Sequence, residues 1–341
     1  MRTLAVRLDS LGDLLVTGPA IRALAAGSDH LTLLCGPRGR DVADLLPGVE
    51  EVLCWRAPWI DPEPDPVDRA EVEGLRARLQ AGRYDRAVVF TSFHQSALPT
   101  ALLLRLAGMP WVGAISEDYP GALLDLRLTG VPDDIPEHER ALRLARAAGA
   151  ELSPGDDGLP AVRRHLAALP AGVEPPYVVL HPGTSVPARA WSPQRYRSLV
   201  DRLVELGHRV VVTGGPGEEE LTAFVADGIA TDLGGRLTVP QLAEVLALAD
   251  AVVVGNTGPA HLAAAVRTPV VSLYAPTVPA VRWRPYGDRV VLLGDQHAAC
   301  RDTRATVCPI PGHPCLDSVT PGEVVAAVTA LCGQPAPVLP V

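Results

Sequence analysis

The sequence contains no lysine: all 30 of its basic residues are arginine, against 39 acidic residues. This absence excludes any chemistry that needs a lysine amine, such as a Schiff base or the phosphate-binding lysine of a P-loop. The formal net charge is −9, and an acidic surface repels phosphate backbones, so we expect no nucleic-acid partner. A small anionic ligand stays compatible with that charge, because backbone amides at helix ends hold phosphate locally.

Long uncharged apolar runs are also missing. Arg7, Asp9 and Asp13 interrupt the N-terminal segment, so we expect no signal peptide, and no run of about 18 apolar residues predicts a membrane span. We therefore expect a cytoplasmic protein with reduced thiols, for which peripheral contact with a membrane stays open. Hydrophobic residues make up 48% of the 341 residues, which is enough to build sizeable cores and excludes wholesale disorder.

The six cysteines do not follow a metal-binding pattern. Cys300, Cys308 and Cys315 share one loop-rich segment with His297 and His313, but their C-x7-C-x6-C spacing lacks the C-x2-C knuckle of structural zinc sites. We expect no metal and interpret the three cysteines as reduced structural thiols. A disulfide pair and metal ligation are the alternatives.

Short apolar runs alternate with helical patterns along the chain, which is typical of a parallel β-sheet covered by helices on both faces. Strands are expected at 4–8, 31–35, 49–55, 86–90, 111–115 and 177–183, within 208–218 and 251–261, and at 269–276. Helices are expected at 13–26, 40–46, 68–81, 95–108, 138–149 and 192–206, from 219, and at 240–249 and 321–332. The fold class is therefore α/β.

A Pro/Gly-rich stretch, LPAGVEPP at 169–176, interrupts this alternation and predicts a linker. We expect an N-terminal domain over 1–168, a C-terminal domain over 177–319, and a final helix and tail over 320–341. Ligands of open α/β sheets bind outside the carboxyl ends of strands, so a cleft between the two halves is the expected site.

The turn after the first strand, SLGD at 10–13, carries a candidate acid–base residue. Gly12 permits a tight turn, and Asp13 is either the helix N-cap or a general base at the carboxyl edge of the sheet. A helix N-terminus keeps a carboxylate ionised but weakens it as a base. The candidates for acceptor contacts are Gly12 and, after the strand at 86–90, His94, Gln95 and Ser96, for which helix capping is the alternative.

Two loops of the C-terminal half suit a pyrophosphate. HPGTSVPARAW at 181–191 supplies hydroxyl donors from Thr184 and Ser185 and a permanent cation from Arg189, while an ordinary loop before a helix is the alternative. GNTGPAH at 255–261 runs from a buried strand into a helix whose free amides favour an anion. Its candidate contacts are Asn256, Thr257, Gly258 and His261, the last of which is equally consistent with a packed core histidine.

A third turn, GGPGEEE at 214–220, offers a carboxylate to the ribose hydroxyls of a nucleotide. Glu218 is our candidate among the three glutamates. The alternative is an exposed acidic first turn that satisfies the helix dipole.

Taken together, these residues resemble glycosyltransferase family 9, the bacterial heptosyltransferases. VRLDSLGDLLVTGPAIRAL is similar to the opening signature of that family, with its aspartate at Asp13. HPGTSVPARAW and GNTGPAHLAAA are similar to its two donor-site motifs, and GGPGEEE, HERALRL and CPIPGHPC also match. The resemblance runs in order over nearly the whole chain.

The resemblance implies a GT-B fold, with two Rossmann-like α/β/α domains facing across a cleft. It implies a metal-independent, inverting glycosyltransferase without a cofactor, which moves a sugar from a nucleoside-diphosphate donor, most often ADP-heptose, to a hydroxyl of a glycan or metabolite, as in lipopolysaccharide core biosynthesis. Asp13 is then the base, and the donor diphosphate lies on the two C-terminal motifs.

Three positions depart from the family pattern. Asn256 stands where lipopolysaccharide enzymes often carry aspartate, Arg189 stands where they carry lysine, and Thr303 stands where close relatives often have another cysteine. The first two departures preserve phosphate binding but leave the exact donor open, and the third argues further against a metal site. A non-catalytic nucleotide-sugar-binding module and a nucleotide-sugar epimerase on the same frame are the alternative functions.

Overall fold

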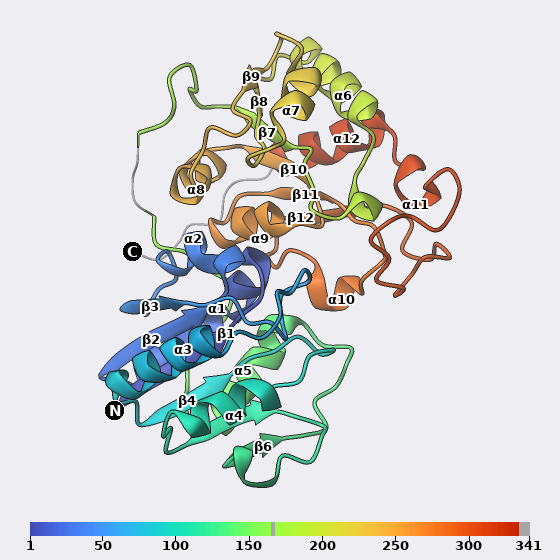
Figure 1. Cartoon of the computed structure of the whole chain (residues 1–341). Coiled ribbons are helices and arrows are strands. Elements are labelled where there is room, and N and C mark those ends of the chain that lie inside the picture. Colours follow the sequence, from blue (N-terminus) through green and yellow to red (C-terminus); the bar gives the residue numbers. More distant parts are fainter. Residues whose placement is uncertain (165–167, 334–341) are drawn as a thin grey trace. The chain divides into compact units, whose positions relative to one another are not determined.

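The computed structural model describes residues 1–164 and 168–333. The chain forms two compact units, one over Met1–Arg163 and one beginning at Arg164 (Figure 1). The division falls before the predicted linker at 169–176, because Arg163 still donates three hydrogen bonds to backbone carbonyls of the first unit. The end of the predicted tail, 334–341, lies outside the described residues.

The first unit is a six-stranded parallel sheet with the spatial order β3-β2-β1-β4-β5-β6. Its strands are β1 (Arg2–Arg7), β2 (His30–Cys35), β3 (Glu51–Cys54), β4 (Arg86–Val89), β5 (Val112–Ile115) and β6 (Leu126–Leu128). Its helices are α1 (Leu11–Ala26), α2 (Arg40–Ala43), α3 (Arg69–Gly82), α4 (Leu98–Leu106) and α5 (Glu137–Ala147), with 3-10 turns η1 (Pro37–Gly39) and η2 (Gly121–Leu123).

The central strands of this sheet are apolar along their whole length because helices cover both faces. Leu4, Ala5 and Val6 of β1 are completely buried. Helices α3 and α4 join a core cluster with Leu4 and Val6, while α1 and α5 pack against each other and against the sheet. Helix α1 begins at Leu11 with Ser10 as its N-cap, so the polar turn after β1 is held at the carboxyl edge of the sheet.

The second unit is another six-stranded parallel sheet, in the order β12-β11-β10-β7-β8-β9. Its strands are β7 (Val178–His181), β8 (Val210–Val212), β9 (Thr231–Asp232), β10 (Ala251–Gly255), β11 (Val270–Leu273) and β12 (Val290–Leu293). Its helices are α6 (Pro193–Glu205), α7 (Glu219–Ala226), α8 (Val239–Ala247), α9 (Gly258–Ala265), α10 (Ala280–Trp283), α11 (Pro314–Asp317) and α12 (Pro321–Cys332), with the 3-10 turn η3 (Pro187–Arg189).

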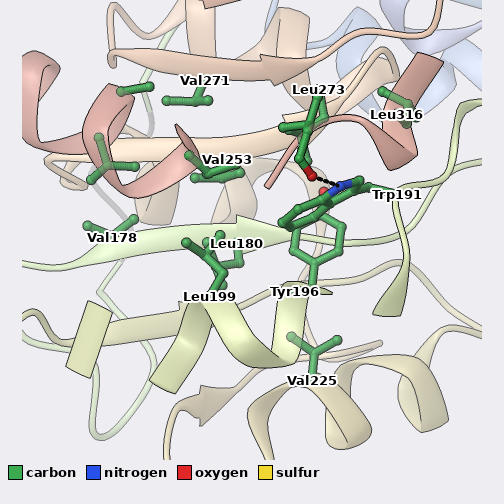
Figure 2. Packing of buried hydrophobic residues seen from close by; sticks show 14 of the residues in the cluster. Val178, Leu180, Trp191, Tyr196, Leu199, Val225, Val253, Val271, Leu273 and Leu316 are labelled. Carbon is green, nitrogen blue, oxygen red and sulfur yellow. Dashed lines mark hydrogen bonds between the residues drawn. The ribbon is translucent and has the colours of Figure 1, made fainter. Parts of the chain in front are cut away.

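The core of the second unit lies between its sheet and helices α6, α7 and α12. Figure 2 shows Trp191 and Tyr196 side by side in this core, with ring centroids 4.9 Å apart and planes at 77°. An edge-to-face pair of this kind stabilises the fold by about 0.5–1.5 kcal/mol beyond the free energy gained by burying its apolar surface. The loop that ends at Trp191 is therefore anchored in the core rather than loose on the surface.

Numbered in chain order within each unit, both sheets have the strand order 3-2-1-4-5-6 of the Rossmann arrangement. The predicted fold class, two α/β units with parallel sheets, is confirmed. The sequence analysis assigned no strand to β6, β9 or β12, and its helix over 40–46 is the shorter α2. Within the described residues, no helix combines the length and the apolar character needed to cross a bilayer.

Candidate functional site

The candidate residues gather at equivalent places in the two units. Strands β1 and β4 are neighbours in the first sheet, β7 and β10 are neighbours in the second, and the strand order reverses at each pair. The carboxyl ends of such a pair are where open α/β sheets bind ligands. Asp13 and Gln95 follow the first pair of strands, and Arg189 and Asn256 follow the second.

Asp13 is the third residue of α1, not its N-cap, which corrects one of the two readings of the sequence. Its Oδ2 accepts hydrogen bonds from the Ser10 backbone N–H at 3.1 Å and from Ser10 Oγ at 2.6 Å, and its Oδ1 accepts from Arg7 Nη2 at 3.0 Å. A carboxylate has about four lone-pair positions, so these bonds leave one on Oδ1 for a substrate hydroxyl.

The electrostatics of Asp13 follow from these contacts. Burial acts to raise its pKa, but the Arg7 cation and the Ser10 hydrogen bonds outweigh burial, so the pKa of Asp13 lies below its ordinary value. The side chain is 17% exposed. Asp13 is therefore a partly accessible carboxylate that stays ionised at neutral pH.

Arg7 is the last residue of β1, and its side chain is only 3% exposed. It forms an ion pair with Asp9, with Nε 2.8 Å from Oδ2, and its Nη2 also donates to Ser92 Oγ at 2.9 Å. Burial raises the pKa of Asp9 above its ordinary value although the Arg7 cation opposes that shift. One buried guanidinium thus serves two carboxylates, Asp9 and Asp13, whose pKa values shift in opposite directions.

The four candidates for acceptor contacts have different surroundings. Gln95 accepts from the Ser92 backbone N–H at 3.0 Å and donates its amide to Asp9. Ser96 Oγ accepts from the Leu98 backbone N–H at the start of α4, in the manner of a cap. The ring of His94 packs edge-on against Phe93, and Gly12 is buried within α1. Their role toward an acceptor stays a prediction.

In the second unit, the loop after β7 and the turn after β10 lie against each other. Arg189 Nη1 donates to the backbone carbonyl of Asn256 at 3.4 Å. A Cβ on Gly255 would lie 3.2 Å from the Arg189 carbonyl oxygen and 3.3 Å from Thr184 Cγ2, so a glycine there allows the close approach. The structure therefore brings the two predicted phosphate motifs together.

Two side chains in these motifs already have partners inside the unit. Asn256 donates to the carbonyl of Ala275 at 3.2 Å and accepts from its N–H at 3.3 Å, which ties the end of β10 to the segment after β11. Thr184 Oγ1 donates to the Val186 carbonyl at 2.7 Å. The parts of these residues best placed to meet a ligand are therefore backbone groups.

Helix α9 supplies further donors. Thr257 is its N-cap and Gly258 its first residue. Pro259 has no N–H, and the Ala260 N–H donates to the Thr257 carbonyl at 3.1 Å, so the amide of this turn best placed to meet a ligand is that of Gly258. The partial positive charge of this helix end and the Arg189 cation both favour an anion. His261, one turn into α9, is 8% exposed.

Glu218 lies over the start of the loop after β7. It is the N-cap of α7 and accepts from the Gly215 N–H at 2.7 Å. A Cβ on Gly183 would lie 2.1 Å from both Glu218 carboxylate oxygens, so any larger residue there would displace the Glu218 carboxylate. His181 Nε2 is 4.0 Å from Glu218 Oε2, and burial lowers the pKa of His181 to about 4, which makes the imidazole neutral.

The cysteine-containing segment, 297–315, packs against the loop that carries Arg189. His313 Nε2 is 3.1 Å from the carbonyl of Ala188, whose N–H donates to the Thr306 carbonyl at 2.9 Å. Trp191 Nε1 donates to the Val319 carbonyl at 3.3 Å. All six cysteines are free thiols, and the described residues contain no group of three or more histidine, cysteine or acidic side chains suited to a metal.

Arg7, Asp9 and Ser92 were not predicted as site residues. Arg7 and Asp9 drew attention only as charges incompatible with a signal peptide. An arginine at the end of an otherwise apolar strand, followed by aspartates two and six residues later, is itself a signal, because a charge in a strand covered on both faces needs a partner. Nothing local to Ser92 indicates that it meets Arg7.

Comparison with known proteins gives a consistent result. Residues 72–312 match the family model described as glycosyltransferase family 9 (heptosyltransferase). The chain is 29% identical over 294 residues to lipopolysaccharide heptosyltransferase 1 of Escherichia coli K12, covering 82% of this chain and 89% of that protein. It is 32% identical over 127 residues to lipopolysaccharide heptosyltransferase 3 of E. coli, covering 36% of this chain and 37% of that protein. The chain spans about two fifths of the length of the two heptosyltransferases 3 that it matches.

The fold has a counterpart among solved structures. The structure of E. coli ADP-heptose lps heptosyltransferase II matches with a TM-score of 0.75 at 21% identity, covering 97% of this chain and 98% of that one. The expected fold class, GT-B with two Rossmann-like units, is confirmed by this match.

Proposed function

The chain belongs to glycosyltransferase family 9, the heptosyltransferase family, and from this premise we propose that it transfers a heptose from ADP-heptose to an acceptor hydroxyl with inversion at the anomeric carbon. The observation that carries the proposal is chemical: the switch point of one unit holds a carboxylate with a free lone pair, and that of the other holds a cation and a helix N-terminus. Base and leaving-group site are the two parts that the transfer needs.

The donor diphosphate binds to the second unit in this proposal. Arg189, the Gly258 amide at the start of α9 and the hydroxyl of Ser185 contact the phosphates, and Glu218 accepts from the ribose hydroxyls. Arg189 replaces a lysine of the family pattern, and its planar guanidinium suits the paired oxygens of a diphosphate. The name of the matched solved structure, ADP-heptose lps heptosyltransferase II, supports adenosine diphosphate as the nucleotide and heptose as the sugar.

The transfer is a single displacement. The acceptor oxygen bonds to the anomeric carbon from the face opposite the diphosphate, the bond between that carbon and the phosphate oxygen breaks, and the acceptor proton passes to Asp13 Oδ1. The negative charge of the departing ADP develops beside Arg189 and the N-terminus of α9. A positioned base contributes about 10²–10⁴-fold to such a rate. The low basicity of Asp13 fits a proton transfer that comes late, after the bond to the donor has begun to break.

The names of the curated relatives support an acceptor on a lipopolysaccharide-type glycan. We propose a sugar hydroxyl as the acceptor, held near Asp13 by residues of the first unit. The proposal needs no metal, because Arg189 and the helix end neutralise the leaving group.

Binding of the nucleotide is the direct test. We predict that ADP raises the melting temperature of the protein, and raises it more than UDP, GDP and dTDP do at the same concentration, because a ligand that binds only the folded state stabilises it by RT ln(1 + [L]/Kd). Arg189→Ala removes the cation beside the diphosphate and should abolish most of the ADP effect. Equal indifference to all four diphosphates would overturn the proposal.

Asp13→Asn separates an enzyme from a binding module. We expect the variant to keep the ADP-induced rise in melting temperature and to lose transfer from ADP-heptose, measured as ADP release in the presence of an acceptor glycan. Full transfer by Asp13→Asn would exclude Asp13 as the base. Binding without transfer in the wild type, across lipopolysaccharide-core acceptors, would favour the binding module.

A further inference from the structure

The buried cation of the first unit has more anionic partners than the proposed reaction uses. Arg7 contacts Asp13 through Nη2 at 3.0 Å and Asp9 through Nε at 2.8 Å. The Asp9 side chain is 9% exposed, less than the 17% of Asp13, and it receives the amide of Gln95. Asp9 is therefore the less exposed of the two carboxylates that share the Arg7 guanidinium.

Other charges face this cluster from several elements. Glu137, at the start of α5, acts electrostatically on Arg7, and Arg38 of η1 acts on Asp9. Ser92 and Gln95, after β4, contribute neutral hydrogen bonds. Within this cluster, the charged groups closer than 3.2 Å are Arg7 with Asp9 and Arg7 with Asp13. These three residues therefore form the strongly coupled unit.

We propose that Asp9 is a positioning residue that keeps Asp13 basic enough to act: it draws part of the Arg7 guanidinium's charge away from Asp13 and holds that guanidinium in place. This inference rests on the proposed role of Asp13 as base. It assigns to Asp9 no contact with the substrate.

The physical reason is a competition for one cation. A carboxylate bound to an arginine that has no other partner loses basicity, because the full positive charge favours its ionised form. A second carboxylate on the same guanidinium neutralises part of that charge and also repels the first carboxylate. Both effects make proton uptake by Asp13 easier. Gln95 donates to Asp9 and so keeps it ionised and oriented in this position.

The test measures the coupled carboxylates directly. The pKa of Asp9 lies above its ordinary value and that of Asp13 below it, so on acidification Asp9 takes up its proton first, while Asp13 is still ionised. In protein labelled with ¹³C at the aspartate side-chain carbons, the titration midpoint of Asp9 is followed by NMR, with its resonance identified by its absence from Asp9→Asn. We expect Asp13→Asn to lower the Asp9 midpoint by about one pH unit, since it removes the competing charge. Asp13→Ser removes the same charge with a smaller side chain and gives a second route should Asp13→Asn fail to fold.

A reciprocal measurement and a matched control complete the design. Asp9→Asn should leave the Asp13 midpoint nearly unchanged, because Asp9 is already neutral at the pH where Asp13 titrates. Asp41→Asn removes one negative charge from an exposed position on α2 and should leave the Asp9 midpoint unchanged. An Asp9 midpoint that stays within about 0.2 pH units of the wild type in the folded Asp13 variants would overturn the inference.

Activity gives a second reading. For Asp9→Asn, the plateau of kcat should fall about threefold as the base weakens. The wild type should show a step of the same size on acidification, when Asp9 takes up its proton before Asp13, and Asp9→Asn should lack this step. The KM for ADP-heptose should not change, because donor contacts lie in the second unit. A merely structural role would lower activity without removing the step. If Asp13→Asn kept full activity, the proposed base would fail; if Asp13→Asn were inactive but left the Asp9 midpoint at its wild-type value, only this inference would fail.

Discussion

His181 is a buried imidazole whose pKa is lowered to about 4 by burial, so it stays neutral in the folded protein until the solution becomes strongly acidic. In the unfolded chain it takes up a proton near the ordinary value of 6.5. Between these values the unfolded state binds more protons than the folded state, so stability falls as pH falls from about 6.5 to 4. The full effect amounts to about 3 kcal/mol.

We therefore predict that His181→Asn, measured by urea unfolding at pH 7 and pH 4.5, loses less free energy of unfolding on acidification than the wild type does. Asparagine retains a polar group for Thr213 Oγ1, which is 3.0 Å from His181 Nδ1. His297→Asn, at an exposed position, is the control and should follow the wild type. Parallel pH dependence in His181→Asn and wild type would contradict the assignment.

At the level of single residues, the sequence indicated several candidate residues, such as Asp13, but not their partners. Asp13 was predicted because a carboxylate that follows a strand and a Gly-containing turn lies at the carboxyl edge of the sheet, where ligands bind. Its link to Arg7 and Ser92 depends on β1 pairing with β4, which joins residues 85 positions apart. Pairing between distant strands leaves no local pattern, and for the same reason the inward bonds of Asn256 to Ala275 were not foreseen.

At the level of elements, long periodic segments were predicted well. The last helix was expected over 321–332, which is the span of α12. In the structure Thr320 caps this helix and a proline occupies its first position. The strands that were missed are short and lie at or next to sheet edges: β9 has two residues and β6 has three. Half-buried edge strands show little apolar patterning. The VVLL run of β12, in contrast, is a short apolar run of the kind that predicts a strand, and the sequence analysis overlooked it.

The support of η3 by the segment after β12 leads to a prediction at this scale. His313 lies at φ +46°, a backbone region that asparagine also tolerates, and its ring contacts the carbonyl of Ala188 beside Arg189. His313→Asn should keep the backbone but lose this hydrogen bond. We expect the dissociation constant for ADP, measured by calorimetry, to rise about fivefold, which corresponds to about 1 kcal/mol.

The same substitution at His297 provides the comparison for that measurement. His297 is an exposed residue of the same segment, and its backbone N–H donates to Asp295 Oδ1 at 2.8 Å. We expect His297→Asn to bind ADP as the wild type does. If both variants bound ADP equally, the segment around the cysteines would not act as a support for the Arg189 loop.

At the level of the whole molecule, the two units repeat one topology, and each has its own core. The strand order 3-2-1-4-5-6 occurs in both sheets, and the buried clusters of the two units share no residue. The order of motifs along the sequence was enough to predict this class of fold. The division after Arg163 follows from hydrogen bonds to distant carbonyls, whereas the Pro/Gly-rich stretch at 169–176 marks a loop.

Separate cores predict separate unfolding transitions in calorimetry, since multidomain proteins often unfold in more than one step. Val89→Ala in β4 and Val253→Ala in β10 each shorten one buried side chain in one core. Each should lower the free energy of unfolding of its unit by about 2 kcal/mol. Each variant should lower the melting temperature of one transition. ADP should raise the transition that Val253→Ala lowers and leave the other in place, because the proposed diphosphate contacts all belong to the second unit.

This experiment also tests where the nucleotide binds without requiring any acceptor. Arg189→Ala supplies the control, since it should remove the ADP-dependent shift while both transitions remain. A shift by ADP of the transition that Val89→Ala lowers would place the nucleotide on the first unit and contradict the proposed donor site. A single transition lowered equally by both core variants would show that the two cores unfold together, and the stabilisation by ADP would then no longer locate the site.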